Sequence, residues 1–348
     1  MNLTYSMNKI TRRAYKIIPR AGSMDRLKLI EETLEPPHGE EICVKVRSIG
    51  LNFADIFAIF GLYSATPKGS FIPGLEYAGE VVSIGKEVKH FKPGDKVMGV
   101  TRFGGYSDRL NIDENYVSHL PEGWTYDEGA AFIVTAFTAY YALVILGNIK
   151  EGNTVLIHSA AGGVGILANR IAKKFNAYTI GSIGSDRKVD LLKKEGYDDY
   201  IIRSGNFRED LRKKLGDKEL NIVLECIGGQ IFRDGFRLLA PEGRMIVYGS
   251  ANYATPGRRP NYLKLIRQYW KRPRLDPMQM MEWNKSVMAF NLIHLYNKKH
   301  YFNRYLSELM EMDIGKPYIG ETYSFDELIK AVRFFQTGKT VGKVIIQV

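Results

Sequence analysis

A short apolar segment that runs directly into a glycine-rich turn constrains this chain most. Residues 154–159 (TVLIHS) have the composition of a buried strand, and the turn 160–168 and a helical pattern, NRIAKKF, follow it. Gly163, Gly165 and Ala168 match the spacing G-x-G-x-x-G/A, in which small residues permit a tight turn and close approach of the backbone to a pyrophosphate. The next helix presents free N–H groups to phosphates. The segment therefore predicts a dinucleotide cradle formed by Ala161, Gly162, Gly163, Val164 and Gly165.

The rest of the chain predicts two kinds of architecture. Residues 13–120 contain short apolar runs separated by Gly, Pro and Asp turns, which is typical of an all-β module resembling a distorted barrel. From about residue 130 strands and helices alternate, which favours a doubly wound parallel sheet and an α/β fold class. Six strands, enough for one complete Rossmann domain, are expected at 154–159, 177–182, 199–203, 221–226, 244–249 and 287–292.

The C-terminal part is expected to return to the first module. A helix of about a dozen residues follows residue 296, and a second helix, DELIKAVRFFQTG, precedes a closing strand, GKVIIQV. We therefore predict a catalytic domain made of residues 1–128 and 296–348, and a cofactor domain made of residues 129–295. The uncharged stretch 129–149 is long enough to span a membrane, but its Thr and Tyr residues and its acidic flank favour a buried helix at the domain junction.

The second strand of the parallel sheet indicates which dinucleotide is bound. NAD sites place an acidic residue at the tip of this strand, whereas NADP sites use basic residues around the 2′-phosphate. The strand ends Ile180-Gly181-Ser182 without a carboxylate, and Ser185, Arg187 and Lys188 follow. Asp186, an acidic residue in the same turn, would instead favour NAD, but it is suited to capping the next helix. The pattern favours NADPH.

Several motifs together resemble a known family. They are 52–55 (NFAD), 61–63 (GLY), 73–79 (PGLEYAG), 92–97 (KPGDKV), the cradle, and 342–344 (GKV). In this order they cover nearly the whole chain and are similar to the quinone oxidoreductase branch of the medium-chain dehydrogenases/reductases. Residues 248–252 (YGSAN), the basic segment after them and 284–292 resemble most the homologues of the synaptic-vesicle amine transport protein.

The resemblance implies a fold and a cofactor position. The expected fold is a GroES-like distorted β-barrel catalytic domain plus a Rossmann domain, with the nicotinamide in the cleft between them. It is expected near Asn52, Thr138 and Gly249. Further positions that match the family's cofactor site are Gly228, Gly229 and Lys343, and Tyr248 is also expected to contact the cofactor.

One position departs from the family pattern. The family usually has a Tyr after the third Rossmann strand, at the adenosine 2′-phosphate, and this chain has Ser204 there, preceded by Arg203. We hypothesise that Arg203 replaces an aromatic contact with a charge-assisted hydrogen bond.

No metal site is expected. The chain has two Cys and six His, too few thiols for a four-thiolate site and no spaced His pair such as HExxH. Both Cys43 and Cys226 lie in strand-like runs, which indicates buried reduced thiols. Zinc members of the superfamily have Cys at the position of Asn52 and Gly-His-Glu at the position of 74–76 (GLE), so the resemblance implies a zinc-free site.

These features predict an NADPH-dependent reductase that delivers hydride to quinones or other electron-poor carbonyl compounds. Positioning supplies much of the acceleration, and the charge that develops on the acceptor oxygen needs a hydrogen-bond donor. Asn52 and Tyr63 are candidate catalytic donors, although Asn52 could instead orient the cofactor and Tyr63 could be a lid aromatic. Asp55 is expected to hold neighbouring polar groups. Reduction of the C=C bond of enones or enals is the alternative.

A basic segment allows a function of another class. Residues 257–274 hold seven basic side chains and no acidic one, within a chain of net charge +11. Apolar residues at helical spacing from Tyr262 to Trp270 predict an amphipathic helix that covers the cleft or a subunit contact, or binds an anionic membrane surface; nucleic acid is the least favoured partner. An NADPH-binding trafficking protein with weak catalysis is therefore a further alternative. The N-terminus has no apolar run typical of a signal peptide, and we expect a cytoplasmic homodimer, peripheral at a membrane in the alternative reading.

Overall fold

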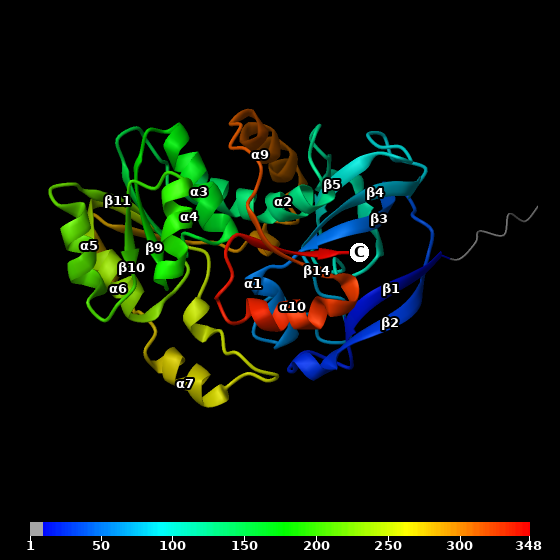
Figure 1. The fold of residues 1–348 in the computed structure, drawn as a ribbon, viewed down its shortest axis with the longest axis horizontal. Helices are drawn as coiled ribbons and strands as arrows, with labels where there is room; N and C mark the ends of the chain where they lie inside the picture. The colour runs from blue at the N-terminus through cyan, green and yellow to red at the C-terminus, as the bar shows by residue number, and fades with distance from the viewer. Residues whose placement is uncertain (1–9) are drawn as a thin grey trace, which may run out of the picture.

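The computed structural model describes residues 10–348. Two sheets stand side by side in it, and the connecting helix α2 (Tyr126–Tyr140) lies between them (Figure 1). We call the part around the first sheet the barrel part and the part around the second the nucleotide part.

The nucleotide part is a six-stranded parallel sheet in the order β10-β9-β8-β11-β12-β13, the order of a complete Rossmann domain. Its strands are β8 (Thr154–His158), β9 (Tyr178–Ile183), β10 (Asp199–Ile202), β11 (Leu220–Glu225), β12 (Leu239–Val247) and β13 (Ser286–Ala289). All six expected strands are therefore present, and β12 begins five residues before the predicted one.

Both faces of this sheet are buried by helices. Val155 and Ile157 pack toward α3 (Gly163–Lys174) and α4 (Val189–Lys194), while Leu156 packs on the other face. Successive strand residues point to opposite faces, so this alternation explains why the strands are apolar throughout. The second face is covered by α5 (Phe207–Leu215) and α6 (Gly229–Leu238).

The barrel part is a mostly antiparallel sheet closed by both ends of the chain, and β14 and β15 pair with each other in parallel and bring the C-terminus to β3. This return matches the expectation for the tail. The domain boundaries at 128/129 and 295/296 stay a prediction. The strands of this sheet are β3 (Glu41–Gly50), β4 (Glu76–Ile84), β5 (Lys96–Val100), β6 (Arg109–Asp113), β7 (Val117–His119), β14 (Ile319–Ser324) and β15 (Lys343–Gln347), and α1 (Phe53–Ile59) and α10 (Leu328–Phe335) lie beside it.

A separate hairpin, β1 (Ile10–Ile17) with β2 (Leu27–Leu34), accompanies the barrel part. The sequence predicts that residues 1–13 (MNLTYSMNKITRR) form an extension before the first strand. Residues 10–13 belong to β1 instead, and residues 1–9 lie outside the described residues.

Helix α2 is the apolar stretch that met the length criterion for a membrane span. It continues as a π-helical turn (Tyr141–Leu146), and the best window of the combined segment has a mean hydropathy of 2.0 with 72% of its residues buried. Thr125 caps its start, reciprocally with Glu128. The helix packs against β3, β4, β5, α3 and α9 (Lys299–Glu311), so its apolar surface is used within the protein.

Two further helices follow β12 and lie at the lower edge of the molecule in Figure 1, where α7 is labelled. They are α7 (Tyr262–Trp270) and α8 (Pro277–Glu282). The predicted helix is therefore present, but its apolar residues are largely exposed: Leu263 is 83% and Trp270 72% exposed. Only part of this face, including Leu265 and Ile266, contributes to the cleft described below.

Candidate functional site

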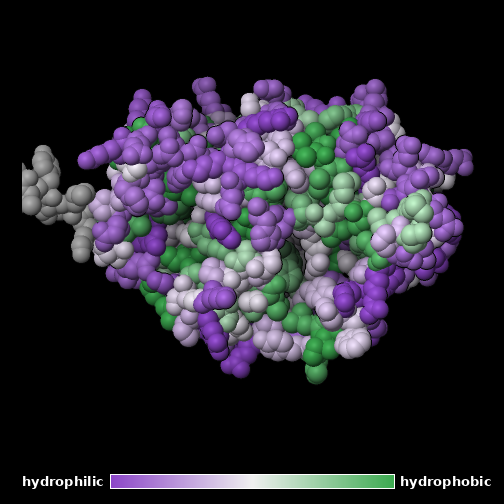
Figure 2. Space-filling model, turned by 180° about the vertical axis from the view of Figure 1, so that it is seen from behind, coloured by the Kyte–Doolittle hydropathy of each residue, from purple (hydrophilic) through white to green (hydrophobic). Residues whose placement is uncertain are grey.

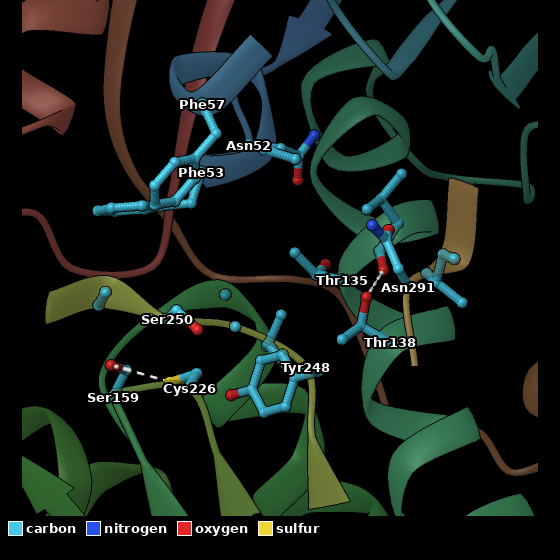
Figure 3. Close-up of a pocket in the computed structure, with 18 of the residues that line it drawn as sticks. Asn52, Phe53, Phe57, Thr135, Thr138, Ser159, Cys226, Tyr248, Ser250 and Asn291 are labelled. Carbon is cyan, nitrogen blue, oxygen red and sulfur yellow. Dashed lines mark hydrogen bonds between the residues drawn. The ribbon is translucent and has the colours of Figure 1, made fainter. Parts of the chain in front are cut away.

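A cavity of about 1160 Å³ lies between the two parts, at the carboxyl ends of the parallel strands (Figure 3). This is where open α/β sheets bind their ligands. Its wall includes most of the residues predicted from the sequence: Asn52, Tyr63, Thr138, Ala161, Gly162, Gly163, Val164, Gly165, Lys188, Arg203, Tyr248, Gly249 and Lys343. The other predicted residues, Asp55, Ser185, Arg187, Gly228 and Gly229, lie outside the wall.

The predicted cradle lies on the floor of the cleft. Helix α3 begins at Gly163 directly after β8, so its unpaired N–H groups face the cavity. A Cβ atom at Gly165 would lie 2.6 Å from the carbonyl oxygen of Ser159, so only glycine allows the loop this close to the strand. The amide of Gly342 donates to the carbonyl of Ala161 at 2.7 Å, which fastens the barrel part to the cradle.

Two cations line the cleft beyond the tip of β9. The Arg203 guanidinium donates to the backbone oxygen and the hydroxyl of Ser182 at 3.1 and 3.3 Å. The Lys188 ammonium donates to the carbonyls of Gly338 and Thr340 at 3.0 and 2.8 Å. Burial, followed by the charge of Arg203, lowers the pKa of Lys188. An anion bound between Lys188 and Arg203 would therefore offset the repulsion between their positive charges.

Ser185 and Arg187 lie in the turn just outside the cleft. The Ser185 hydroxyl caps the short helix Asp186–Lys188, and the Asp186 carboxylate accepts the Arg187 amide at 2.8 Å. The capping role that the sequence suggested for Asp186 therefore belongs to Ser185, because the helix begins one residue earlier, at Asp186 itself. Arg187 is exposed, and its predicted contact with the cofactor stays a proposal.

Gly228 belongs to a turn that a buried carboxylate holds in place. Glu225, at the end of β11, accepts the amides of Ile227 and Gly228 at 2.5 and 2.7 Å. Burial raises the pKa of Glu225 to about 7. Gly228 has a φ of +86°, a conformation that favours glycine, so this turn depends on both the carboxylate and the glycine.

A buried polar network lies where the nicotinamide is expected. The Asn52 amide nitrogen donates to Glu76 at 2.8 Å and to the carbonyl of Gly50 at 3.3 Å, while its oxygen accepts from the Lys343 ammonium at 2.7 Å. Lys343 also pairs directly with Glu76. Because an ammonium only donates, the Asn52 oxygen must face Lys343. Both amide hydrogens of Asn52 are therefore already used inside the protein.

Asp55 lies beneath this network. Its carboxylate accepts the backbone N–H of Asn52 at 2.8 Å and the Tyr106 hydroxyl at 3.0 Å. Burial raises the pKa of Asp55 to about 7, against the lowering effect of these hydrogen bonds. Asp55 is 1% exposed, so its carboxylate is enclosed by these polar groups, and the positioning role expected from the sequence stays a prediction.

Tyr63 reaches the cleft from the loop after α1. Its hydroxyl donates to Asn291 at 2.6 Å, which joins the barrel part to the segment after β13. Burial raises the pKa of Tyr63 to about 12. The phenol is therefore neutral at physiological pH and suited to donate a hydrogen bond.

The sequence of the chain matches two protein families and a set of known relatives. Residues 38–132 match the family described as alcohol dehydrogenase GroES-like domain, and residues 163–303 match the zinc-binding dehydrogenase family. The chain is 32% identical over 330 residues to the synaptic vesicle membrane protein VAT-1 homolog of Rattus norvegicus, covering 93% of this chain and 81% of that protein.

Solved structures of two other proteins superpose on the chain over nearly its whole length. The structure of Escherichia coli quinone oxidoreductase complexed with NADPH superposes with a TM-score of 0.83 at 25% identity, covering 97% of this chain and 100% of that one. The CurK enoyl reductase has the same fold, with a TM-score of 0.80 at 24% identity and coverage of 97% and 99%. The chain belongs to the quinone oxidoreductase branch of the medium-chain dehydrogenases/reductases. Its GroES-like and Rossmann-type architecture confirms the predicted α/β fold class.

The Escherichia coli quinone oxidoreductase of similar structure was solved in complex with NADPH. The glycine cradle, the start of α3 and the cations Lys188 and Arg203 fit its phosphates. The individual residue assignments remain proposals.

The position of the superfamily's catalytic metal does not fit zinc. Zinc sites use thiolate, imidazole or carboxylate ligands, whereas Asn52, Leu75 and Glu76 offer a single carboxylate. That carboxylate already forms an ion pair with the Lys343 ammonium. Within residues 10–348 no group of three or more His, Cys, Asp or Glu could hold a metal ion.

Sequence reasoning missed several residues of the wall. Cys226 lies at the end of β11, and its thiol donates to the Ser159 hydroxyl at 3.4 Å; burial raises its pKa (Figure 3). Its position after a parallel strand was the signal that could have identified it. Asn291 and the aromatic side chains Phe53 and Phe57 had no such signal, because their place in the cleft arises from contacts between distant segments.

We predict that Arg203→Ala weakens NADPH binding about 10- to 100-fold, because a hydrogen bond to a charged group is worth roughly 1.5–3 kcal/mol. Affinity for NADH, which lacks the 2′-phosphate, should change less than about twofold. Fluorescence titration with both cofactors measures this. Lys213→Ala, which removes an exposed cation from α5, is the control. Equal loss for both cofactors would contradict the assignment.

A pH prediction follows from Asp55. Its pKa is raised in the folded protein, so the proton it keeps adds stability that is present at low pH and lost as pH rises through about 7. The free energy of unfolding of Asp55→Asn relative to the parent should therefore increase by roughly 2–3 kcal/mol between pH 5 and pH 8. Urea unfolding at several pH values measures it. Asp190→Asn, at an exposed position, should run parallel to the parent, and a parallel course for Asp55→Asn would refute the prediction.

Proposed function

We propose that this protein is an NADPH-dependent, zinc-independent reductase that passes hydride to quinones or related electron-poor carbonyl compounds. The observation that carries the proposal is the Lys343 ammonium, 3% exposed, at the Asn52 end of a cleft whose cradle holds the cofactor. The relationship to quinone oxidoreductases supports it.

Lys343 provides the fixed positive charge of this site. NADPH, when bound, supplies the hydride. As negative charge develops on the acceptor oxygen, a preorganised ammonium in a water-poor cleft stabilises it. Lys343 is held by Asn52 and Glu76, so it needs no rearrangement during the reaction. Quinones are already good acceptors and require little more than this.

Asn52 acts by position in this proposal, and Tyr63 acts as a hydrogen-bond donor. Asn52 orients Lys343, since its own N–H groups are used by Glu76 and Gly50. Tyr63 lies in the cleft wall and exchanges its bond to Asn291 for one to the acceptor oxygen. Reduction of enones or enals would use the same groups, and the enoyl reductase fold relative supports that alternative.

Metal-stripped protein should oxidise NADPH with 1,2- and 1,4-quinones, and at least tenfold more slowly with NADH at equal concentration. Absorbance at the nicotinamide band, with a panel of quinones and enones, measures this. Lys343→Met should reduce kcat about 100- to 1000-fold, the range for loss of one preorganised hydrogen-bond donor. Turnover with enones alone would transfer the proposal to double-bond reduction, and restoration of activity only by zinc would overturn it.

We also propose a homodimer in which the outer edge of β13 pairs with its counterpart. Within the described residues β13 pairs only with β12, so one edge is free for another strand.

A second candidate function rests on α7. Its exposed apolar residues lie beside exposed cations, among them Arg267, Lys271 and Arg274. Figure 2 shows apolar side chains projecting at the lower edge of the molecule, the edge at which α7 lies in Figure 1. Such helices bind at anionic membrane surfaces, where each basic group contributes about 1 kcal/mol. The vesicle-membrane name of the relatives supports this proposal.

Co-sedimentation with liposomes tests the membrane candidate. Binding to vesicles containing phosphatidylserine should weaken with salt, and Leu263→Asp should reduce the bound fraction severalfold, because it places a charge among the inserting side chains. Leu29→Asp, on the exposed face of β2, is the matched control. A chain that stays in the supernatant at low salt removes the candidate.

A further inference from the structure

One end of the cleft is lined by aromatic side chains from four segments of the chain. Phe137 and Tyr141 come from α2 and its π-helical continuation, Tyr116 from the turn before β7, Phe290 and Tyr296 from the connection between β13 and α9, and Phe302 from α9. We call these six residues the aromatic lobe. The predicted catalytic and cofactor residues do not include any of them.

The lobe is a packed and ordered surface. The rings of Phe137 and Phe302 are stacked with centroids 5.2 Å apart, and those of Tyr116 and Tyr296 are stacked at 3.8 Å. Tyr141 contacts Phe290 at a centroid distance of 5.0 Å. The hydroxyl of Tyr116 donates to the carbonyl of Tyr296 at 2.7 Å, so this polar group is already satisfied. The surface left to a ligand is therefore largely apolar.

The charged side chains of the cleft wall lie outside the aromatic lobe. Among the described residues, the charged side chains of the cleft wall are Lys188, Arg203, Lys298 and Lys343. The first two are at the cofactor phosphates and Lys343 is held by Asn52. Lys298 lies 4.9 Å from the ring of Tyr301, at the start of α9, and is exposed. No carboxylate lines the wall, and one cation marks the outer rim of the lobe.

The lobe is continuous with the place of hydride transfer. Thr138 follows Phe137 on α2, and Asn291 follows Phe290, and Figure 3 shows both on the same side of the pocket. The ring of Phe290 also stacks on Tyr248 with centroids 6.3 Å apart. A substituent on an acceptor bound near Thr138 would therefore extend directly into the lobe.

We propose that the aromatic lobe binds an aliphatic or isoprenoid chain carried by the acceptor, so that the preferred substrates are long-chain, uncharged quinones or enones. This inference rests on the proposed reductase function. A cavity of about 1160 Å³ exceeds the roughly 300–1,000 Å³ of ordinary ligand pockets, as expected of a cleft that accommodates a dinucleotide and a large acceptor together. Each buried methylene improves affinity up to about fourfold, so a chain gives selectivity that a small quinone head cannot.

The test is a series of 2-alkyl-1,4-benzoquinones with methyl, hexyl and decyl chains, used below their micelle concentrations. For the parent protein, kcat/KM should rise at least tenfold from methyl to decyl. Leu292→Trp fills the wall beside the lobe and should reduce the decyl-to-methyl ratio to below about threefold. Leu29→Trp makes the same change on the exposed face of β2, outside the cleft wall, and should keep the parent ratio. A ratio near one for the parent, or a ratio unchanged in a folded Leu292→Trp, overturns the proposal.

A binding measurement separates this inference from the proposed function. Calorimetry with the corresponding alkyl hydroquinones in the presence of NADP⁺ needs no turnover. Tighter binding of the decyl compound without oxidation of NADPH by any quinone would support the lobe and refute quinone reduction. Quinone turnover without any chain-length dependence in rate or binding would refute the lobe alone, as would a preference for polycyclic quinones over alkylated ones.

Discussion

The buried ion pair between Lys343 and Glu76 is the interaction on which this architecture depends most. Glu76 is fully buried on β4, accepts from Asn52, and also accepts the amide of Val134 on α2 at 2.9 Å. Breaking a buried pair by removing one partner is costly, because it leaves an uncompensated charge. The pair thus joins the C-terminal strand β15, strand β4, the loop before α1 and the central helix at one point.

Close packing around this point follows from small residues. A Cβ atom at Gly50 would lie 2.1 Å from the carbonyl of Ala130 and 2.7 Å from Glu76. Helix α2 can therefore lie directly on the end of β3, with its Thr135 and Thr138 hydroxyls bonded back to its own backbone. The helix leaves few polar groups unsatisfied at the junction, which is why a segment of such high hydropathy forms part of a folded interior.

Local patterns predicted much of this molecule. The cradle, the positions of the parallel strands and the cations after β9 depend on residues close together in the sequence, where spacing determines geometry. The Asn52–Lys343 contact joins residues 291 positions apart, and no periodicity could reveal that Asn52 has its amide hydrogens occupied. The aromatic lobe was missed for the same reason. The amphipathic pattern of α7 predicted a helix correctly, but not that its apolar residues would be exposed, since a pattern does not show what faces it.

The stretch from Gly338 to Lys343 contacts both ends of the cofactor site. Gly338 and Thr340 accept from Lys188 near the expected 2′-phosphate, Gly342 donates to the cradle, and Lys343 reaches Asn52. Gly342 cannot be replaced by a residue with a side chain, because a Cβ atom there would lie 2.4 Å from the carbonyl oxygen of Tyr318. Under the proposed function, one short peptide would therefore couple cofactor preference to hydride geometry. Substitutions in this stretch are then expected to change both properties together, so a lineage could not adjust one of them here independently of the other.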